Sequence, residues 1–226
     1  MFEFDWNMIV QSRGLLMTGM WLTLQVTLVA ILAGLGFGII LAAMSVVKVP
    51  VLNWLAKMYV SLFRSIPLVM LLLWFFLIVP QVLKSVLNIS PSVDIRLISA
   101  MVAFSMLEAA FFCEIIRAGI QSLPAGQFSA AKALGMNWAQ SMRLIILPQA
   151  FRKMLPITLT QCIVIFQDTS LVYVIALGDF FSRAKSVGER DGTLIQMLLF
   201  AGLTYWVICS LATIVVKYVQ GRVKYD

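Results

Sequence analysis

Histidine is missing from this sequence of 226 residues, and only 12% of the residues are charged. Without histidine the chain cannot build a His-based metal site or a Ser/His/Asp or Cys/His catalytic centre. Its three cysteines are far apart within apolar segments, which is typical of small buried side chains and not of a disulfide framework. We therefore expect no catalytic residue and no metal site in this chain.

Apolar residues dominate what the sequence does contain. Hydrophobic residues make up 62% of the chain, and the mean hydropathy is +0.97. Soluble domains have about 45–50% apolar and about 25% charged residues, so this chain has too little polar surface to fold in water. The apolar runs are continuous and do not alternate, which predicts an all-α integral membrane protein and not a β-barrel.

Five apolar segments are long enough to cross the hydrocarbon core of a membrane, which is about 30 Å thick. They predict a single transmembrane domain over residues 1–226 with five spanning helices. The predicted spans cover residues 15–44, 58–80, 97–117, 154–176 and 193–216.

The distribution of basic residues predicts the orientation of these spans. With five spans the termini lie on opposite sides, and eleven Lys and Arg residues fall on one side against six on the other. Because cytoplasmic loops are enriched in Lys and Arg, we expect the N-terminus outside and the C-terminus in the cytoplasm. The net charge of +7 is thus explained by orientation, and nucleic acid is not an expected partner.

Polar side chains interrupt the third and fourth predicted spans. Glu108 falls near mid-membrane, where an unpaired carboxylate costs about 3 kcal/mol or more, so it should face protein or water. Gln161 and Asp168 are seven residues apart, as are Thr160 and Gln167, and the two pairs predict one narrow polar stripe on a helix face. Such a stripe lines a pathway or contacts a neighbouring helix. We nominate four of these residues for a substrate pathway: Glu108, Gln161, Gln167 and Asp168.

Glycines are concentrated in the first predicted span, at Gly34, Gly36 and Gly38. Small residues at this spacing let two helix backbones approach closely, so they predict a packing surface. A nucleotide-binding loop is excluded because no strand precedes them.

The loop over residues 121–148 contains the signals of two short helices. Residues 127–134 favour a helix, and Gly135 suits the left-handed position that ends one. Asn137 can cap a second helix, which we expect Pro148 to end. The pair would form a compact cytoplasmic knob that docks into another protein; an ordinary loop is the alternative.

The same loop carries a recognisable motif. Ser129-Ala130-Ala131, then Gly135, then Ile145-x-Leu147-Pro148, resembles the cytoplasmic EAA motif of permease subunits in binding-protein-dependent ABC importers. Ser129 stands where that family usually has glutamate. Other segments resemble the polar amino acid branch of these permeases, and in particular one of the two permeases of bacterial glutamate/aspartate systems. The likeness to the branch lies in residues 63–68, 114–122, 147–150 and 168–171, and the likeness to the glutamate/aspartate permease lies in residues 94–104, 166–173 and 188–192.

This resemblance implies a type I ABC importer permease in the bacterial inner membrane, with polar amino acids, most specifically glutamate and aspartate, as its substrates. Its implied partners are a second permease subunit in a heterodimer, a dimer of ATPase subunits and a periplasmic amino acid binding protein. The coupling residues would be Ser129, Ala130, Ala131 and Gly135. No lysine directly follows a glycine, so the chain has no phosphate loop, and ATP and Mg²⁺ are expected on the ATPase.

An ion-coupled secondary amino acid carrier is the alternative. In such a carrier Glu108 or Asp168 would bind a proton or a sodium ion. Five spans without an evident inverted repeat favour the importer permease over this alternative.

Overall fold

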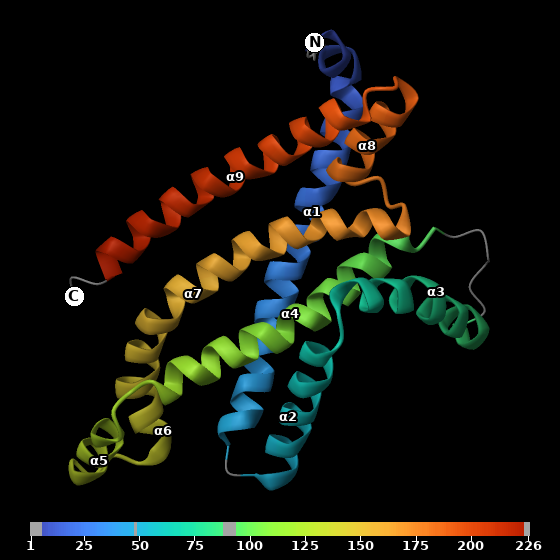
Figure 1. The fold of residues 1–226 in the computed structure, drawn as a ribbon. Coiled ribbons are helices and arrows are strands. Elements are labelled where there is room, and N and C mark those ends of the chain that lie inside the picture. Colours follow the sequence, from blue (N-terminus) through green and yellow to red (C-terminus); the bar gives the residue numbers. More distant parts are fainter. Residues whose placement is uncertain (1–5, 48, 88–93, 224–226) are drawn as a thin grey trace.

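The computed structural model describes residues 6–47, 49–87 and 94–223, and every regular element in these ranges is helical. Figure 1 shows long helices that cross one another at steep angles. The elements are α1 Trp6–Val46, α2 Pro50–Ser65, α3 Leu68–Leu87, α4 Arg96–Gln121, α5 Ala125–Ala133, α6 Trp138–Ser141, the π-helix η1 Met142–Ile146, α7 Leu147–Asp168, the 3₁₀-helix η2 Thr169–Ile175, α8 Phe180–Arg190 and α9 Leu194–Val223. The predicted all-α class is confirmed.

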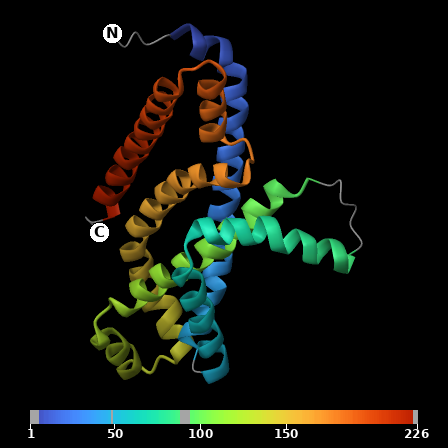
Figure 2. The same cartoon turned by 45° about the vertical axis from the view of Figure 1, so that its right-hand side comes forward.

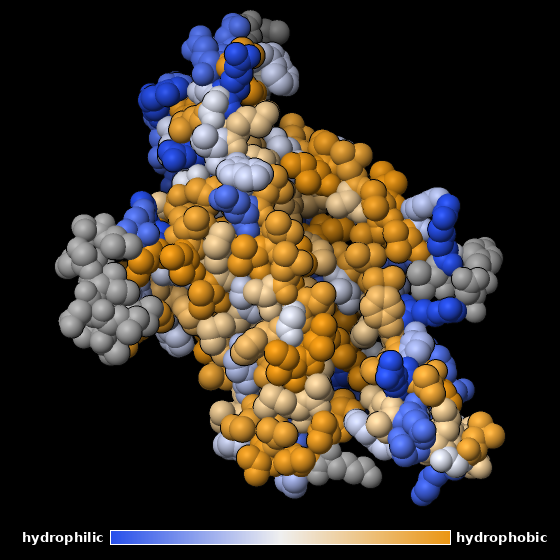
Figure 3. All heavy atoms as spheres, turned by 180° about the vertical axis from the view of Figure 1, so that it is seen from behind, coloured by the Kyte–Doolittle hydropathy of each residue, from blue (hydrophilic) through white to orange (hydrophobic). Residues whose placement is uncertain are grey.

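The structure has four continuous helical segments that are long and apolar enough to cross a membrane among the described residues. They are α1, α4, the segment Trp138–Ile175 and α9, and the bent pair of α2 and α3 makes a fifth. Seen from behind, apolar side chains form a broad central area and polar side chains gather toward the ends (Figure 3). The prediction of five spans holds when the bent pair counts as one.

The second predicted span, residues 58–80, is not one straight helix. The axes of α2 and α3 meet at an angle of 100°. Ile66 between them has extended backbone angles, with φ −102° and ψ 130°. Pro67 is the cause, because its ring disfavours helical geometry in the preceding residue and it has no N–H to donate. Hydropathy cannot detect this bend, since both halves remain apolar.

The centre of the fold is the close crossing of α1 and α4. A Cβ atom at Gly34 would lie 2.8 Å from the Cβ of Glu108, and one at Gly38 would lie 2.7 Å from the Cβ of Phe112. These distances leave no room for any side chain at the two glycines. The predicted packing role of the first-span glycines is therefore confirmed for Gly34 and Gly38, whereas a Cβ at Gly36 would meet nothing within 4 Å.

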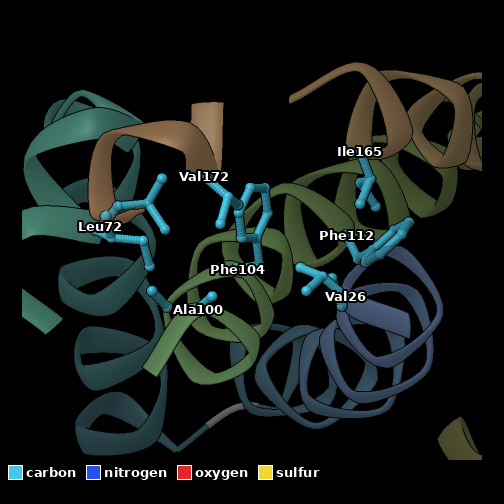
Figure 4. Packing of buried hydrophobic residues seen from close by; sticks show 10 residues of the cluster. Val26, Leu72, Ala100, Phe104, Phe112, Ile165 and Val172 are labelled. Atoms are coloured by element: carbon cyan, nitrogen blue, oxygen red, sulfur yellow. The ribbon is translucent and has the colours of Figure 1, made fainter. Parts of the chain in front are cut away.

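An apolar core joins this crossing to the other helices. Figure 4 shows side chains from α1, α3, α4, α7 and η2 that meet around Phe104 and Phe112. Both rings are fully buried. Lipid tails are as apolar as these side chains, so the core stabilises the bundle mainly through close van der Waals packing.

One helical segment runs from residue 138 to residue 175, where the sequence predicts a helix that Pro148 ends. α6 continues through η1 into α7, and Pro148 lies in the first turn of α7. In η1 the N–H of Leu147 donates to the carbonyl of Met142, five residues earlier. The first turn of a helix tolerates proline because its missing N–H needs no partner there, and the wide π turn provides the junction. The expectation that Pro148 ends the helix is wrong.

The helix α8 is not among the elements predicted from the sequence, and it packs beside the N-terminal half of α1 (Figure 2). Asp179 caps α8 by accepting hydrogen bonds from the Phe181 N–H at 3.0 Å and from the Ser182 hydroxyl. The Thr23 hydroxyl of α1 accepts from the Phe180 N–H at 3.1 Å. Burial raises the pKa of the Asp179 carboxyl group, although its hydrogen bonds lower it. An aspartate before a short amphipathic segment is the signal that predicts such a helix.

The helices α5 and α6 lie at the opposite end of the molecule from α8 (Figures 1 and 2). The predicted topology likewise puts these two segments on opposite sides of the membrane. The orientation of the termini stays a prediction. Five of the charged residues that support it lie outside the described residues: Glu3, Asp5, Lys48, Lys224 and Asp226.

Candidate functional site

Glu108 and Gln161 meet in the centre of the fold. The side-chain amide of Gln161 on α7 donates to Oε2 of Glu108 on α4 at 3.0 Å. Glu108 is 0% exposed, and its Oε1 has no hydrogen-bond partner among the described residues. Burying a charged carboxylate without partners is very costly, so the hydrogen bond from Gln161 offsets part of the cost of burying Glu108. In this conformation Glu108 reaches no surface, so it can act on a pathway only through Gln161.

The other two nominated residues lie at the end of α7 on different sides. Asp168 is half-buried, and because it follows Gln161 by seven residues it lies on the same face of α7. Gln167 is exposed and lines a hollow of about 580 Å³ between α7 and α9, together with Lys217. Successive helical residues are about 100° apart, so Gln161 and Gln167 do not share one face. The expectation of a single narrow stripe is wrong: Gln161 pairs with Glu108 and Asp168 follows on the same face of α7, whereas Gln167 lines the hollow toward α9.

The first helix of the predicted knob, α5, ends in a left-handed turn. The N–H of Met136 donates to the carbonyl of Ala131 at 3.1 Å, and the N–H of Gly135 donates to that of Lys132 at 3.0 Å. This pair of bonds is a Schellman motif, which needs a left-handed residue just past the helix. Gly135 has a φ of +76°, so the predicted bend is confirmed.

The second helix of the knob begins with a capping box. The Asn137 side chain accepts from the Gln140 N–H at 2.9 Å, and the Gln140 side chain accepts from the Asn137 N–H at 2.9 Å. The predicted cap at Asn137 is confirmed. Between the two caps, Leu134 is 79% exposed and Trp138 is also exposed. The capped turn therefore presents apolar side chains on a rigid backbone.

The four nominated coupling residues differ in accessibility. Ser129, Ala130 and Gly135 are exposed, whereas Ala131 is fully buried. The Ser129 hydroxyl donates to the carbonyl of Ala125 on its own helix at 3.4 Å. Ser129 thus carries no charge at the position where a glutamate would present one. Ala131 is on the buried face of α5, and Ser129, Ala130 and Gly135 are accessible to a partner protein.

The nominated residues leave out a charged cluster between α2 and α4. Arg117 donates to the two oxygens of Glu114 at 3.1 and 2.7 Å, and Arg64 Nη1 lies 3.7 Å from Glu114 Oε2. The spacing of three residues between Glu114 and Arg117 on one helix predicts this ion pair, which is confirmed. The approach of Arg64 depends on how α2 packs against α4.

A polar pair buried among spanning helices, with a rigid knob at one end, defines a multi-pass membrane transport protein of the permease class. Residues 34–225 match the family described as "Binding-protein-dependent transport system inner membrane component". The chain belongs to this family and is a permease subunit of an ABC importer in the inner membrane.

Relatives and solved structures agree with this assignment. The chain is 59% identical over 222 residues to the glutamate/aspartate import permease protein GltK of Escherichia coli, covering 98% of this chain and 99% of GltK. It is 32% identical to the arginine transport system permease protein ArtQ of Bacillus subtilis, covering 97% of each. A crystal structure of an amino acid ABC transporter with histidines superposes with a TM-score of 0.87 at 25% identity, covering 98% of this chain and 100% of that chain. The MetNI methionine ABC transporter shares the fold, with a TM-score of 0.73 at 18% identity, covering 94% of this chain and 98% of that chain.

Proposed function

We propose that this chain and a second, different permease subunit form the membrane pathway of an ATP-driven importer for glutamate and aspartate. The observation that carries this proposal is the 59% identity to GltK over 98% of the chain. Identity of this level over nearly the whole of both chains supports a shared substrate class.

ATP hydrolysis on a separate ATPase dimer drives transport through the knob formed by α5 and α6. Ser129, Ala130 and Gly135 contact the ATPase, with Leu134 beside them, and buried Ala131 fixes α5 against the rest of the knob. ATP and Mg²⁺ bind to the ATPase subunits. The knob therefore faces the cytoplasm, which puts the N-terminus outside, the C-terminus inside and α8 on the side of a periplasmic amino acid binding protein.

The substrate pathway passes the end of α7. Asp168 and Gln161 are its polar groups on this chain, Glu108 orients Gln161, and Gln167 acts from the hollow toward α9. Carboxylates repel an acidic substrate at short range in a poor dielectric. Asp168 therefore holds the ammonium group of the amino acid, while cations from the second permease bind its carboxylates.

Reconstituted uptake tests the proposal. The chain is purified with its second permease and ATPase, placed in proteoliposomes with ATP on the ATPase side, and supplied with binding protein and labelled amino acids. We expect ATP-dependent uptake of glutamate and aspartate, with stimulated ATP hydrolysis. Stimulation by glutamine or arginine alone would overturn the substrate assignment and leave the importer class standing. Uptake driven by an ion gradient without ATP would restore the secondary carrier.

A further inference from the structure

A pocket outside the proposed pathway lies between α2 and the inner third of α4. Its volume is about 410 Å³, and the polar side chains that line it are Lys57, Ser61, Arg64, Ser65, Glu114 and Arg117. Three cations and one carboxylate give this pocket an excess of positive charge. Lys57 directly precedes the predicted span 58–80 and Arg117 ends the predicted span 97–117, so both lie where long cationic side chains reach the headgroup region.

The internal ion pairs do not use up this positive charge. Glu114 is the one carboxylate of the pocket, and it is shared by Arg117, at 2.7 Å, and Arg64, at 3.7 Å. Lys57 forms no ion pair within the described part of the chain. Ser61 and Ser65 also line the pocket, and the Ser65 hydroxyl donates to the Ser61 carbonyl at 2.7 Å. The pocket therefore keeps N–H donors that are not engaged in ion pairs, and these donors suit an anion.

An apolar hollow adjoins this pocket. Its volume is about 460 Å³, and it shares Lys57 and Ser61 with the cationic pocket while adding Trp54, Met58 and Leu62. All three apolar side chains are exposed. A cationic pocket that continues into an exposed apolar surface on one membrane helix matches a ligand with a charged head and an apolar body.

We propose that this pocket binds an anionic phospholipid, with the headgroup phosphate at Lys57, Arg64 and Arg117 and the apolar part of the lipid against Trp54 and Met58. A phosphate diester carries one negative charge and accepts several hydrogen bonds, which Arg side chains recognise well. A free dicarboxylate has no long apolar part that could pack against the adjoining apolar surface, so the geometry favours a lipid over the transported substrate. In the proposed orientation the site lies in the cytoplasmic leaflet, beside the loop that leads to the knob.

The test compares the lipids retained by the complete transporter. The complex is reconstituted in vesicles with equal amounts of phosphatidylglycerol and phosphatidylcholine, extracted in detergent, and its retained lipids are counted by mass spectrometry. Lys57→Gln is the main variant because it breaks no ion pair, and Arg64→Gln is the second. The matched control is Arg152→Gln, which removes one exposed cation from α7, outside the pocket. Trp54→Ala tests the apolar contact.

We expect retention of phosphatidylglycerol over phosphatidylcholine, and a loss of about fivefold for each cation removed from the pocket. Arg152→Gln should retain phosphatidylglycerol like the wild type, and Trp54→Ala should lose part of it. Equal retention of the two lipids, or an equal loss in Arg152→Gln, overturns the proposal. Displacement of the lipid by excess glutamate assigns the pocket to the substrate. Tight binding of labelled inorganic phosphate, with no effect of Trp54→Ala on lipid retention, assigns it to a free anion.

Discussion

Gln161 on α7 donates a hydrogen bond of 3.0 Å to Glu108 on α4, and the two residues are 53 positions apart in the sequence. The bond connects a helix at the centre of the bundle to the helix that continues from the knob. Because one oxygen of Glu108 has no partner among the described residues, the bond to Gln161 is the only hydrogen bond observed for this carboxyl group.

Replacing Gln161 by leucine should destabilise the protein. The variant leaves Glu108 buried without a donor, and an unsatisfied buried polar group costs about 1–3 kcal/mol. Glu108→Gln should cost less, because the amide keeps the shape and an acceptor oxygen. Thermal unfolding of the purified complex measures both variants, and Thr160→Val, at an exposed position of α7, is the control. A larger loss in Glu108→Gln than in Gln161→Leu would show that charge, and not the hydrogen bond, matters here.

Gly38→Ala should destabilise the crossing of α1 and α4. The new Cβ would lie 2.7 Å from the Cβ of Phe112 and 3.0 Å from the carbonyl oxygen of Ala109, so the backbones must separate. Overpacking of this kind costs about 1–3 kcal/mol. Gly36→Ala on the same helix is the control, since its Cβ would meet nothing within 4 Å. Equal unfolding temperatures for the two variants would contradict the close approach.

Gly135→Val should uncouple ATP hydrolysis from transport. A β-branched residue at φ +76° is strained by about 1–2 kcal/mol, so the turn that presents Leu134 would change shape. We expect substrate-stimulated ATPase activity to fall while the complex still assembles. Gly126→Ala in α5 has free space and ordinary helical geometry, and it should keep full activity. Full coupled activity in Gly135→Val would show that the knob does not transmit the ATPase signal.

Asp168→Asn should lower the rate of glutamate and aspartate uptake about tenfold. The substitution keeps the shape and removes the charge, and one charge-assisted hydrogen bond contributes about 1.5 kcal/mol, which corresponds to a factor of about ten. Uptake into proteoliposomes at several substrate concentrations measures affinity and rate separately. Unchanged values for both would remove Asp168 from the pathway.

The contact between Asp94 and Arg96 should depend on pH. Hydrogen bonds from the Arg96 side chain and backbone lower the pKa of the Asp94 carboxyl group to about 2. The carboxylate of Asp94 therefore contributes stability above the unfolded pKa of about 4, and the contribution is lost as the pH falls toward 2. Because the pair is exposed, the contribution is at most about 1 kcal/mol. We expect Asp94→Asn to lower the unfolding temperature slightly at pH 7, and by progressively less as the pH falls from 4 to 2. A constant difference across this range would contradict the ionic contribution.

Local signals in the sequence predict a large part of the fold. Long apolar runs predict four spans as continuous helices, and Gly135 with Asn137 predicts the turn and the cap of the knob. Each of these features depends on a few neighbouring residues, through hydropathy, a left-handed glycine or a capping side chain. For that reason they can be read without knowing the partner helix.

The sequence does not predict the backbone geometry at the junctions between helices. Pro67 divides the second span, whereas Pro148 lies inside a continuous helix, although both prolines follow apolar residues. The difference lies in the backbone around them: Ile66 is extended, and the π turn before Pro148 provides a helical entry. A proline alone does not specify which of the two will occur.

The sequence by itself determines that this chain is a membrane protein with four or five spans and that it carries a bent knob, because hydropathy and turn chemistry act locally. Only the tertiary structure decides that Glu108 pairs with Gln161, that Gln167 faces α9, and that Arg64 joins Glu114. These contacts join residues from different helices, and the close approach at Gly34 and Gly38 sets which faces of α1 and α4 meet. Helix rotation and crossing are properties of the packed bundle, so no single segment contains them.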